Sequence, residues 1–370
     1  MLIVGQAPSH PLLQINTGSS SIWAVTYAAN GEYLLSGGSE KVQVWRVQDG
    51  KEMATIPTGI VRCVAMSKDC RWIAAGTFWG DVIVWKAKTH DPKTMAYVKV
   101  MAYRNNNSNI HAVDFSPDST RLVAASENRT ASVCAISTGK RVFGPLLHKD
   151  AVIAAKYSPQ GDRIATATEN SVQIYDSNDG SSLMDIPVKV TSYYNAGLLW
   201  SNEQLLVVSD GKIKKIEFPS TEPPSESEWL VPNTSQLSSG IALSQRGEFV
   251  ACRARRAVTF WDMSEEHPEP RVTVLYPQNI HSIALSPDDR FIAIGGNGGV
   301  IIFESLSCIN VRIVYCRTTA YLNHFIIALT HHDRHQLATK VKKLSSPRPR
   351  PAMTTNHRWD FFIVSLKASH

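Results

Sequence analysis

The sequence predicts an all-β protein in which seven small four-stranded sheets form a ring. One observation is a repeated phrase, since NIHSIALSPDDRFIAIGGNGGVIIF at 279–303 opens almost as NIHAVDFSPDSTRLVAAS does at 109–126. The second is its spacing, because related segments follow at intervals of 39, 49, 42, 43, 43 and 42 residues. Repeats of about 40–45 residues with four strands each are typical of propeller blades, so we expect a seven-bladed β-propeller. The units begin at Ile22, Val61, Ile110, Val152, Asn195, Ser238 and Ile280.

Each unit can be assigned strand by strand. The first strand alternates, as in IWAVTY or IHAVDF, and ends in a turn such as SPDS, SPQG or SPDD. Proline, aspartate and glycine favour a tight turn there. A second apolar strand follows, as in RLVAA or RFIAIG, and a third ends in an aromatic residue, as in KVQVW, DVIVW or SVQIY. Fourth strands are expected near Met53, Val98 and Val274, and no helix is required between Leu12 and Ser305.

Over roughly residues 11–305 these features resemble the WD-repeat (WD40) β-propeller family. The resemblance rests on the S-P-D-type turns, the aromatic ends of the third strands and the spacing. It extends to WD-repeat arrays of signalling scaffolds and of STAND-type proteins, although no phosphate-binding loop is present. The Trp-Asp pair occurs only at Trp261–Asp262, Tyr175–Asp176 is a variant of it, and no Gly-His dipeptide opens a repeat. We therefore expect the family's buried Asp-His-Ser-Trp hydrogen-bond network to be largely missing.

Two segments compete to close the ring as the fourth strand of the last blade. One is PLLQINT, with Leu12, Leu13 and Ile15 in a fourth-strand pattern, and the other is VRIVY at 311–315. Both cannot pair with the same edge. We favour the N-terminal segment, because the repeat pattern is lost beyond Asn310 and WD-repeat rings are similar in joining their chain ends.

Composition and charge limit the remaining choices. The 370 residues are 43% hydrophobic and 19% charged, which is ordinary for a globular protein. The net charge of +6 is uneven: the segment from Val311 has ten basic and two acidic residues, or +8, which leaves −2 for the rest. We predict a propeller over 11–305 and a basic tail over 306–370, partly disordered or the product of a wrongly predicted gene end. With no apolar run long enough for a membrane helix, we expect a cytoplasmic or nuclear chain with its six cysteines reduced, mostly as core residues.

The sequence motifs offer little support for a catalytic site. HHDRH at 331–335 has two histidines four residues apart but lacks the glutamate of a zinc-protease motif, so an exposed tail helix is favoured. GGNGG at 295–299 joins two strands and opens no helix, which makes it a hairpin rather than a phosphate loop. The predicted first strands, which would line the central channel, offer Asp114 as a lone acid. We expect no catalytic residue, cofactor, metal or small-molecule substrate.

The resemblance implies one binding rim. In the family, residues beside the start of the first strand and residues in the turn between the second and third strands lie on the same rim. The aromatic and arginine members favour binding, since such residues dominate interface energies. The alternatives are that Trp23 and Trp79 pack against neighbouring blades and that the histidines are satisfied within their strands. The candidates are Trp23, Arg62, Phe78, Trp79, Asn109, His111, Glu127, Asn279 and His281.

The function these features favour is a non-enzymatic scaffold that presents this rim to a protein or peptide partner. One alternative is nucleic-acid binding through the basic tail, which would be strongly salt-dependent. Another is a channel enzyme of the lactonase or quinoprotein type. Acidic loops at 219–228 and 264–270 are expected on the opposite rim, where they could steer partners or keep the ring in solution.

Overall fold

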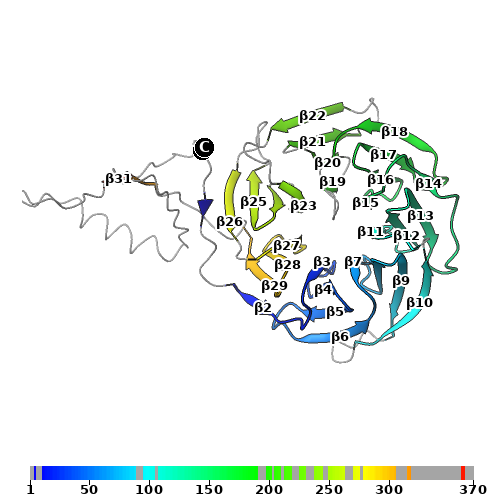
Figure 1. Ribbon diagram of the computed structural model, residues 1–370, viewed down its shortest axis with the longest axis horizontal. Coiled ribbons are helices and arrows are strands. Elements are labelled where there is room, and N and C mark those ends of the chain that lie inside the picture. The colour runs from blue at the N-terminus through cyan, green and yellow to red at the C-terminus, as the bar shows by residue number, and fades with distance from the viewer. Residues whose placement is uncertain are drawn as a thin grey trace, which may run out of the picture.

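The computed structural model describes residues 4–5, 11–88, 95–104, 107–190, 197–201, 204–209, 212–218, 225–230, 237–244, 249–262, 270–275, 278–305, 315–317 and 360–362. Within these ranges every regular element is a strand, and no helix long and apolar enough to cross a bilayer occurs in them. Seven sheets surround a central channel (Figure 1), which confirms the predicted seven-bladed β-propeller. The basic tail, including the 331–335 histidines, lies outside the described residues apart from β30 (Tyr315–Arg317) paired with β31 (Asp360–Phe362).

The first four blades follow the predicted repeat closely. Their strands are β3 (Ile22–Tyr27), β4 (Tyr33–Gly38), β5 (Lys41–Arg46) and β6 (Glu52–Pro57); β7 (Val61–Met66), β8 (Trp72–Thr77), β9 (Asp81–Ala87) and β10 (Tyr97–Arg104); β11 (Ile110–Phe115), β12 (Arg121–Ser126), β13 (Thr130–Ala135) and β14 (Leu146–Leu147); β15 (Ala154–Tyr157), β16 (Arg163–Ala167), β17 (Ser171–Asp176) and β18 (Ser182–Pro187). Each sheet is an antiparallel meander. The fourth blade begins its first strand two residues after the expected position at Val152.

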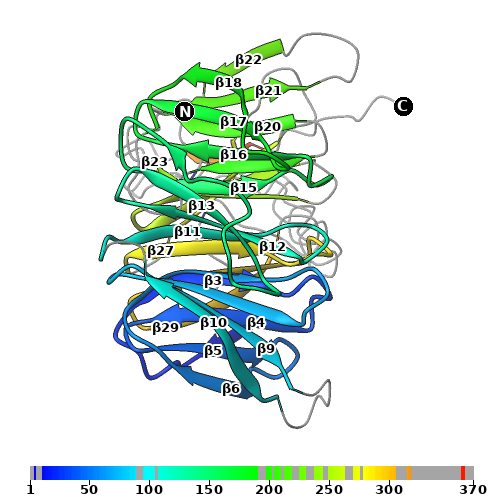
Figure 2. The ribbon, with the colours of Figure 1, turned by 90° about the vertical axis from the view of Figure 1, so that its right-hand side faces the viewer.

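The last three blades complete the circle. Their strands are β19 (Leu198–Ser201), β20 (Gln204–Ser209), β21 (Lys212–Glu217) and β22 (Ser225–Leu230); β23 (Leu237–Leu243), β24 (Phe249–Ala254), β25 (Ala257–Asp262) and β26 (Pro270–Leu275); β27 (Ile280–Leu285), β28 (Phe291–Gly296) and β29 (Gly299–Glu304). First strands of neighbouring blades are in contact all the way round, including β27 with β3. Figure 2 shows the strands crossing the thickness of the ring, so the hairpins between them form its two rims.

The N-terminal segment closes the ring, as predicted. Strand β2 (Leu13–Ile15) pairs antiparallel with β29, with Leu13 opposite Ile302 and Ile15 opposite Val300. The amide of Leu12 adds a hydrogen bond of 3.0 Å to the carbonyl of Ile302. Because β2 covers the outer edge of β29, the last blade has a fourth strand taken from the beginning of the chain. A further strand, β1 (Val4–Gly5), pairs parallel with β26.

A serine organises the turn after the first strand. In the third blade the Ser116 hydroxyl donates to Asp118 and accepts a hydrogen bond of 2.9 Å from the amide of Arg121, five residues on. The amides of Trp72 and Phe291 bond in the same way to the hydroxyls of Ser67 and Ser286. These buried hydroxyls satisfy an amide that the tight turn would otherwise leave unpaired. The recurrent serine of the S-P-D phrase therefore has a structural role.

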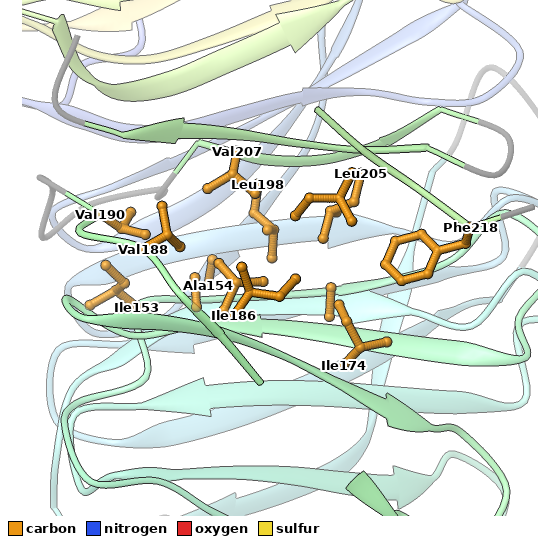
Figure 3. Close-up of a cluster of buried hydrophobic side chains, with 14 residues drawn as sticks. Ile153, Ala154, Ile174, Ile186, Val188, Val190, Leu198, Leu205, Val207 and Phe218 are labelled. Carbon is orange, nitrogen blue, oxygen red and sulfur yellow. The ribbon is translucent and has the colours of Figure 1, made fainter. Parts of the chain in front are cut away.

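Apolar faces of adjacent sheets hold the ring together. Figure 3 shows the cluster between the fourth and fifth blades, where Ile174 and Ile186 face Leu198 and Leu205, and Phe218 lies at one side. Similar clusters occupy the neighbouring interfaces. Burial at roughly 25 cal/mol per Å² makes these contacts the main source of stability.

Three glycines set the spacing between blades. Gly37, Gly76 and Gly295 occupy the same place in β4, β8 and β28, the fifth residue of the second strand. A Cβ on Gly76 would lie 2.4 Å from Cγ2 of Ile110, at the start of the next blade. Glycine is required there because the first strand of the following blade packs directly on the backbone.

The described cysteines are free thiols, mostly in the core. Cys63, Cys134 and Cys252 are buried, in agreement with the prediction. Cys70 differs, since it is half-buried and lies in a turn with a φ of 58°. The other two cysteine side chains lie outside the described part of the chain.

Candidate protein-binding rim

Four of the predicted rim residues share one backbone feature. Trp23, Arg62, His111 and His281 are each the second residue of a first strand, and each lies where the register to the second strand shifts by one residue. A β-bulge leaves one residue out of the ladder and turns its side chain away from the regular alternation. Each bulge thereby takes one side chain out of the regular alternation between the channel and the interior of the blade.

The bulged residues of three blades form a stack with aromatic neighbours. The rings of Trp23 and His281 are 4.3 Å apart and inclined by 31°. Cζ of Arg62 lies 4.9 Å from the ring centre of Trp23 and also 4.9 Å from that of Phe78. Phe78 meets Trp79 edge to face at 5.0 Å. Because cation–π contacts and aromatic pairs each contribute about 0.5–1.5 kcal/mol, this stack is fixed in place.

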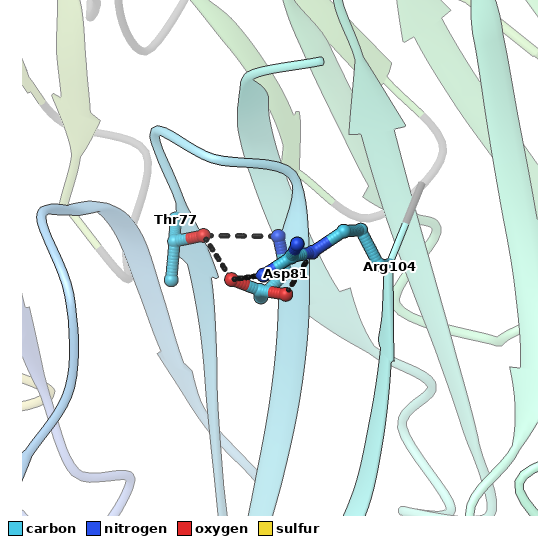
Figure 4. Close-up of polar contacts among 3 residues, drawn as sticks. All are labelled: Thr77, Asp81 and Arg104. Carbon is cyan, nitrogen blue, oxygen red and sulfur yellow. Dashed lines mark hydrogen bonds and ion pairs between the residues drawn. The ribbon is translucent and has the colours of Figure 1, made fainter. Parts of the chain in front are cut away.

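A polar clamp holds the hairpin that carries Phe78 and Trp79 (Figure 4). The guanidinium of Arg104 donates to both carboxylate oxygens of Asp81, at 2.8 and 3.3 Å. The amide of Asp81 donates to the hydroxyl of Thr77 at 2.9 Å. The clamp fixes the backbone, yet the Trp79 side chain remains 56% exposed. A large apolar side chain is thus presented to solvent by a rigid turn.

The third blade continues the rim with a more polar set. Asn109 donates to Glu127 at 2.6 Å, and the backbone amide of Glu127 donates to the carbonyl of Asn109 at 2.9 Å. His111 lies beneath them and is only 6% exposed. Burial lowers the pKa of His111, the charge of Glu127 opposes this shift, and the charge of Arg62 adds to it. The neutral His111 ring therefore supports the rim from below and does not itself reach a partner.

The seventh blade holds His281 in a defined tautomer. Nε2 of His281 lies 2.8 Å from the side-chain oxygen of Asn297, which also accepts a hydrogen bond from Ser21. An amide oxygen only accepts, so Nε2 carries the proton. Burial lowers the pKa of His281, and the positive charges of Arg253 and Arg62 lower it further.

Two arginines of the sixth blade, neither of them among the predicted rim residues, extend the rim. Arg253 stands in β24 where Gly37, Gly76 and Gly295 stand in other blades, and its guanidinium donates to the carbonyl of Ile280 at 2.8 Å. It is 6% exposed. Burial lowers its pKa to about 10, so it stays charged at neutral pH. The exposed Arg255 donates to the side chain of Asn279 at 3.3 Å. The sequence feature that could have identified Arg253 is an arginine at a position where three other blades have glycine.

All nine predicted rim residues therefore lie on one rim. Trp23, Arg62, Phe78, Trp79 and His281 make direct contacts with one another. The Asn109–Glu127 pair lies on one side of this stack and the Asn279–Arg255 pair on the other. We call the whole set, with Arg253 and Arg255, the arginine–aromatic rim.

The central channel has a different character. Its cavity of about 260 Å³ is lined mainly by small and aliphatic side chains of the first strands, with Lys156 and Cys63 the titratable ones. Lys156 forms an ion pair of 2.9 Å with Asp114, the lone acid of the predicted first strands. Asp114 also accepts a hydrogen bond from the backbone amide of Tyr157. Burial raises the pKa of the Cys63 thiol to about 12, so it is no nucleophile at neutral pH. Among the described residues, no cluster of three metal-ligating side chains occurs.

Two blades contain buried polar contacts like those that the resemblance implies. In the fourth blade Nε2 of His148 lies 2.8 Å from the Thr166 hydroxyl and 3.3 Å from the Tyr175 hydroxyl. In the first blade the Trp45 indole donates to Ser36 at 2.8 Å. These contacts in two blades leave in place the expectation that the network is largely missing, and His148 was not anticipated because it follows a leucine instead of a glycine. The acidic loops predicted on the opposite rim lie largely outside the described residues.

Comparison with known proteins agrees with the architecture. The family model "WD domain, G-beta repeat" matches residues 10–46, 50–86 and 98–134. The U3 small nucleolar RNA-associated protein 15 homolog of Xenopus tropicalis is 24% identical over 246 residues, covering 61% of this chain and 44% of that protein. Its Xenopus laevis counterpart is 22% identical over the same length. The chain thus spans less than half the length of these relatives.

A solved structure shares the fold. A chain of Kuenenia stuttgartiensis hydrazine synthase superimposes with a TM-score of 0.65 at 14% identity, covering 81% of this chain and 99% of that one. At that identity the likeness concerns the fold alone. A closed ring of seven four-stranded blades makes the chain a β-propeller. Its first three blades contain WD40 repeats, and the predicted resemblance to the WD-repeat family is confirmed.

Proposed function

We propose that the chain is a non-enzymatic interaction module whose arginine–aromatic rim binds a protein or peptide partner. The observation that supports this best is Trp79, 56% exposed on a clamped hairpin. Exposing a tryptophan to water is unfavourable, and a side chain already held in place loses little entropy on binding. Leu183, another solvent-facing apolar residue, lies on the outer strand β18 away from the rim.

The absence of enzymatic activity is part of the proposal. The channel offers an ion-paired carboxylate and a protonated thiol, neither of which is prepared for nucleophilic or acid–base chemistry. A lactonase-like or quinoprotein-like channel enzyme would need converging carboxylates or metal ligands. We therefore place the function on the rim.

Nucleic-acid binding is the second candidate. The names of the two amphibian relatives associate them with a small nucleolar RNA, which favours the nucleus over the cytoplasm for this chain as well. The basic tail that would carry such binding lies outside the described residues. RNA retention by the full chain and by a chain ending at Asn310, compared across a salt series, tests it: equal retention dismisses the tail.

Substitution at Trp79 tests the rim. Immobilised Trp79→Ala and Arg62→Ala proteins should lose partners that the wild-type protein captures from a lysate. The melting temperature should be almost unchanged for Trp79→Ala and lower by a few degrees for Arg62→Ala, which loses two cation–π contacts. Leu183→Ala is the control for exposed apolar surface, since Leu183 is 53% exposed. Arg71→Ala is the control for charge, because the exposed Arg71 lies in the turn between β7 and β8, at the opposite rim. If both rim variants capture the same proteins as wild type, the rim is not the binding surface.

A further inference from the structure

The second blade carries an excess of positive charge that the rest of the propeller lacks. Residues 58–104 have eight basic and three acidic side chains, or +5, which leaves −7 for the remainder of residues 1–310. The outer strand of this blade, β10, has eight residues and lies on the circumference of the ring (Figure 1). A local positive charge and a long outer edge therefore occur in the same blade.

Two exposed valines lie among lysines on β10. Val98 is 41% and Val100 45% exposed. The register shifts between Lys99 and Met101, which leaves Val100 out of the ladder. Val98 lies opposite Lys86 of β9, and cross-strand partners share a face of the sheet. Apolar and positively charged side chains are therefore neighbours on this edge.

The third blade adds charge to the same face. Nζ of Lys86 lies 5.2 Å from the ring centre of Trp72, which packs against the cluster between the second and third blades. A Cβ on Gly139 of the third blade would lie 3.4 Å from Cγ of Met101 in β10. Two exposed basic residues directly follow that glycine. We call the exposed residues of both blades the outer basic patch, which consists of Lys86, Lys88, Val98, Lys99, Val100, Lys140 and Arg141.

Acidic side chains are scarce around this patch. The described residues 82–88, 95–104 and 136–147 contain no Asp or Glu. Asp81, just before them, is paired with Arg104 at 2.8 Å. Asp69 and Asp118, in the adjoining turns, each accept hydrogen bonds within their own turn. The five positive charges of the patch are therefore not balanced within it.

The composition of the patch fits an anionic lipid surface better than other anionic ligands. Basic side chains attract acidic headgroups, and aliphatic side chains gain by entering the boundary between headgroups and acyl chains. A single-stranded nucleic acid would need exposed aromatic faces for its bases, and the patch has none. Four of the five cations are lysine, a residue that is depleted in protein–protein interfaces.

We propose that the outer basic patch binds an anionic membrane surface, with its cations at the lipid headgroups and Val98 and Val100 at the apolar boundary. The contact is peripheral and reversible, since each basic side chain near such a surface strengthens binding by only about fivefold. The inference goes beyond the proposed function and does not depend on the arginine–aromatic rim.

Vesicle binding by the full-length chain tests this proposal. Vesicles of phosphatidylserine and phosphatidylcholine in equal amounts are sedimented with the protein, and the lipid concentration at half-binding is measured. Lys88→Gln combined with Lys140→Gln should raise that concentration by about fivefold for each charge removed. Arginine at both positions should restore binding, because the surface attracts charge and not one side-chain shape. Vesicles of phosphatidylcholine alone should bind much less.

The valines provide a readout that charge alone does not change. Val98→Ser should raise the lipid concentration at half-binding by about fourfold, the contribution of one buried methylene group, and this ratio should persist as salt is raised. Arg290→Gln and Leu183→Ser are the controls, since both side chains are exposed in other blades, and neither should alter binding. Melting temperatures identify any variant whose loss reflects unfolding.

Every other outcome overturns the proposal. Equal half-binding concentrations for wild type, the double lysine variant and Val98→Ser would assign any vesicle binding to the basic tail. Equal binding to both kinds of vesicle would remove the role of charge. A random single-stranded RNA pool is tested in parallel, and RNA retention that the lysine variant loses, without vesicle binding by wild type, would favour a nucleic acid. The proposed function stands or falls separately with the rim variants.

Discussion

Gly76→Ala is expected to force the second and third blades apart. A Cβ at this position would lie 2.4 Å from Cγ2 of Ile110, 2.6 Å from Sγ of Cys63 and 2.7 Å from Cβ of Ile110. All three atoms are buried, and two belong to a strand of the next blade. Overpacking of this kind costs about 1–3 kcal/mol. Since each kcal/mol shifts the melting temperature of a large domain by about 2–4 °C, we expect a drop of several degrees.

The control and the rescue come from the same chain. Gly144 has no atom within 4 Å of an added Cβ, and its φ is not in the left-handed region, so Gly144→Ala should leave stability unchanged or raise it slightly. Ile110→Ala alone should cost about 2–5 kcal/mol. Combined with Gly76→Ala it should cost less than the sum of the two, by roughly 0.5–3 kcal/mol, because the shortest of the three contacts, to Cγ2 of Ile110, is removed. Thermal unfolding followed by circular dichroism measures all four proteins. A Gly76→Ala protein as stable as wild type, or strictly additive costs, would refute the packing of the third blade on this glycine.

Three further perturbations address the clamp, the buried histidine and the ring closure. Asp81→Asn should lower the free energy of unfolding by at most about 1 kcal/mol, since the ion pair with Arg104 is exposed. It should nevertheless speed amide hydrogen exchange in the hairpin around Trp79, and unchanged exchange there would contradict the clamp. His148→Leu should lose about 0.5–1.5 kcal/mol at pH 7.5, because the Thr166 hydroxyl loses one hydrogen bond and keeps its bond to the Gln173 carbonyl. Burial lowers the pKa of His148 in the folded protein. As the pH decreases below about 6.5, His148 is therefore protonated more readily in the unfolded chain, and the stability of the wild-type protein decreases. Between pH 7.5 and pH 5.5 the free energy of unfolding, measured by urea titration, should fall less for His148→Leu than for wild type. An equal fall in both proteins would show that His148 does not cause the pH dependence. A chain lacking residues 1–17 exposes the edge of β29 and should melt earlier and scatter more light than one lacking only 1–10; identical behaviour would dismiss closure by β2.

The ring itself was predictable because its determinants are local and repeated. Alternating apolar residues, the S-P-D turns and the spacing specify strands and blades without reference to distant contacts. Closure by the N-terminal strand was predictable for a related reason, since Leu13 and Ile15 follow the pattern of a fourth strand and β29 needed a partner. The prediction was least accurate where the repeat is weakest, as in the fifth blade, where the expected start is the polar Asn195 and the first strand begins three residues later at Leu198.

The details of the rim depend on hydrogen-bond register and on partners far apart in sequence. The register shifts at Trp23 and Arg62 leave no mark in the sequence, because a bulge changes pairing and not composition. The stacking of Trp23 on His281 joins residues of the first and last blades, which only ring closure brings together. The pairing of His148 with Thr166 likewise spans 18 residues. Family resemblance indicated the rim positions, and the contacts among them needed the structure.

The residue at the fifth position of the second strand connects packing to function. Gly37, Gly76 and Gly295 allow the next blade to pack on bare backbone, and Ala125 keeps the side chain minimal in the third blade. Arg253 breaks this rule with a buried cation, whose desolvation is unfavourable and whose guanidinium donates to the Ile280 carbonyl. Departures from a packing rule at a cost in stability are expected where a site is built. Arg253 lies near His281, whose ring begins the stack with Trp23 and Arg62. The blade that has arginine in place of the small residue therefore has this arginine within the arginine–aromatic rim.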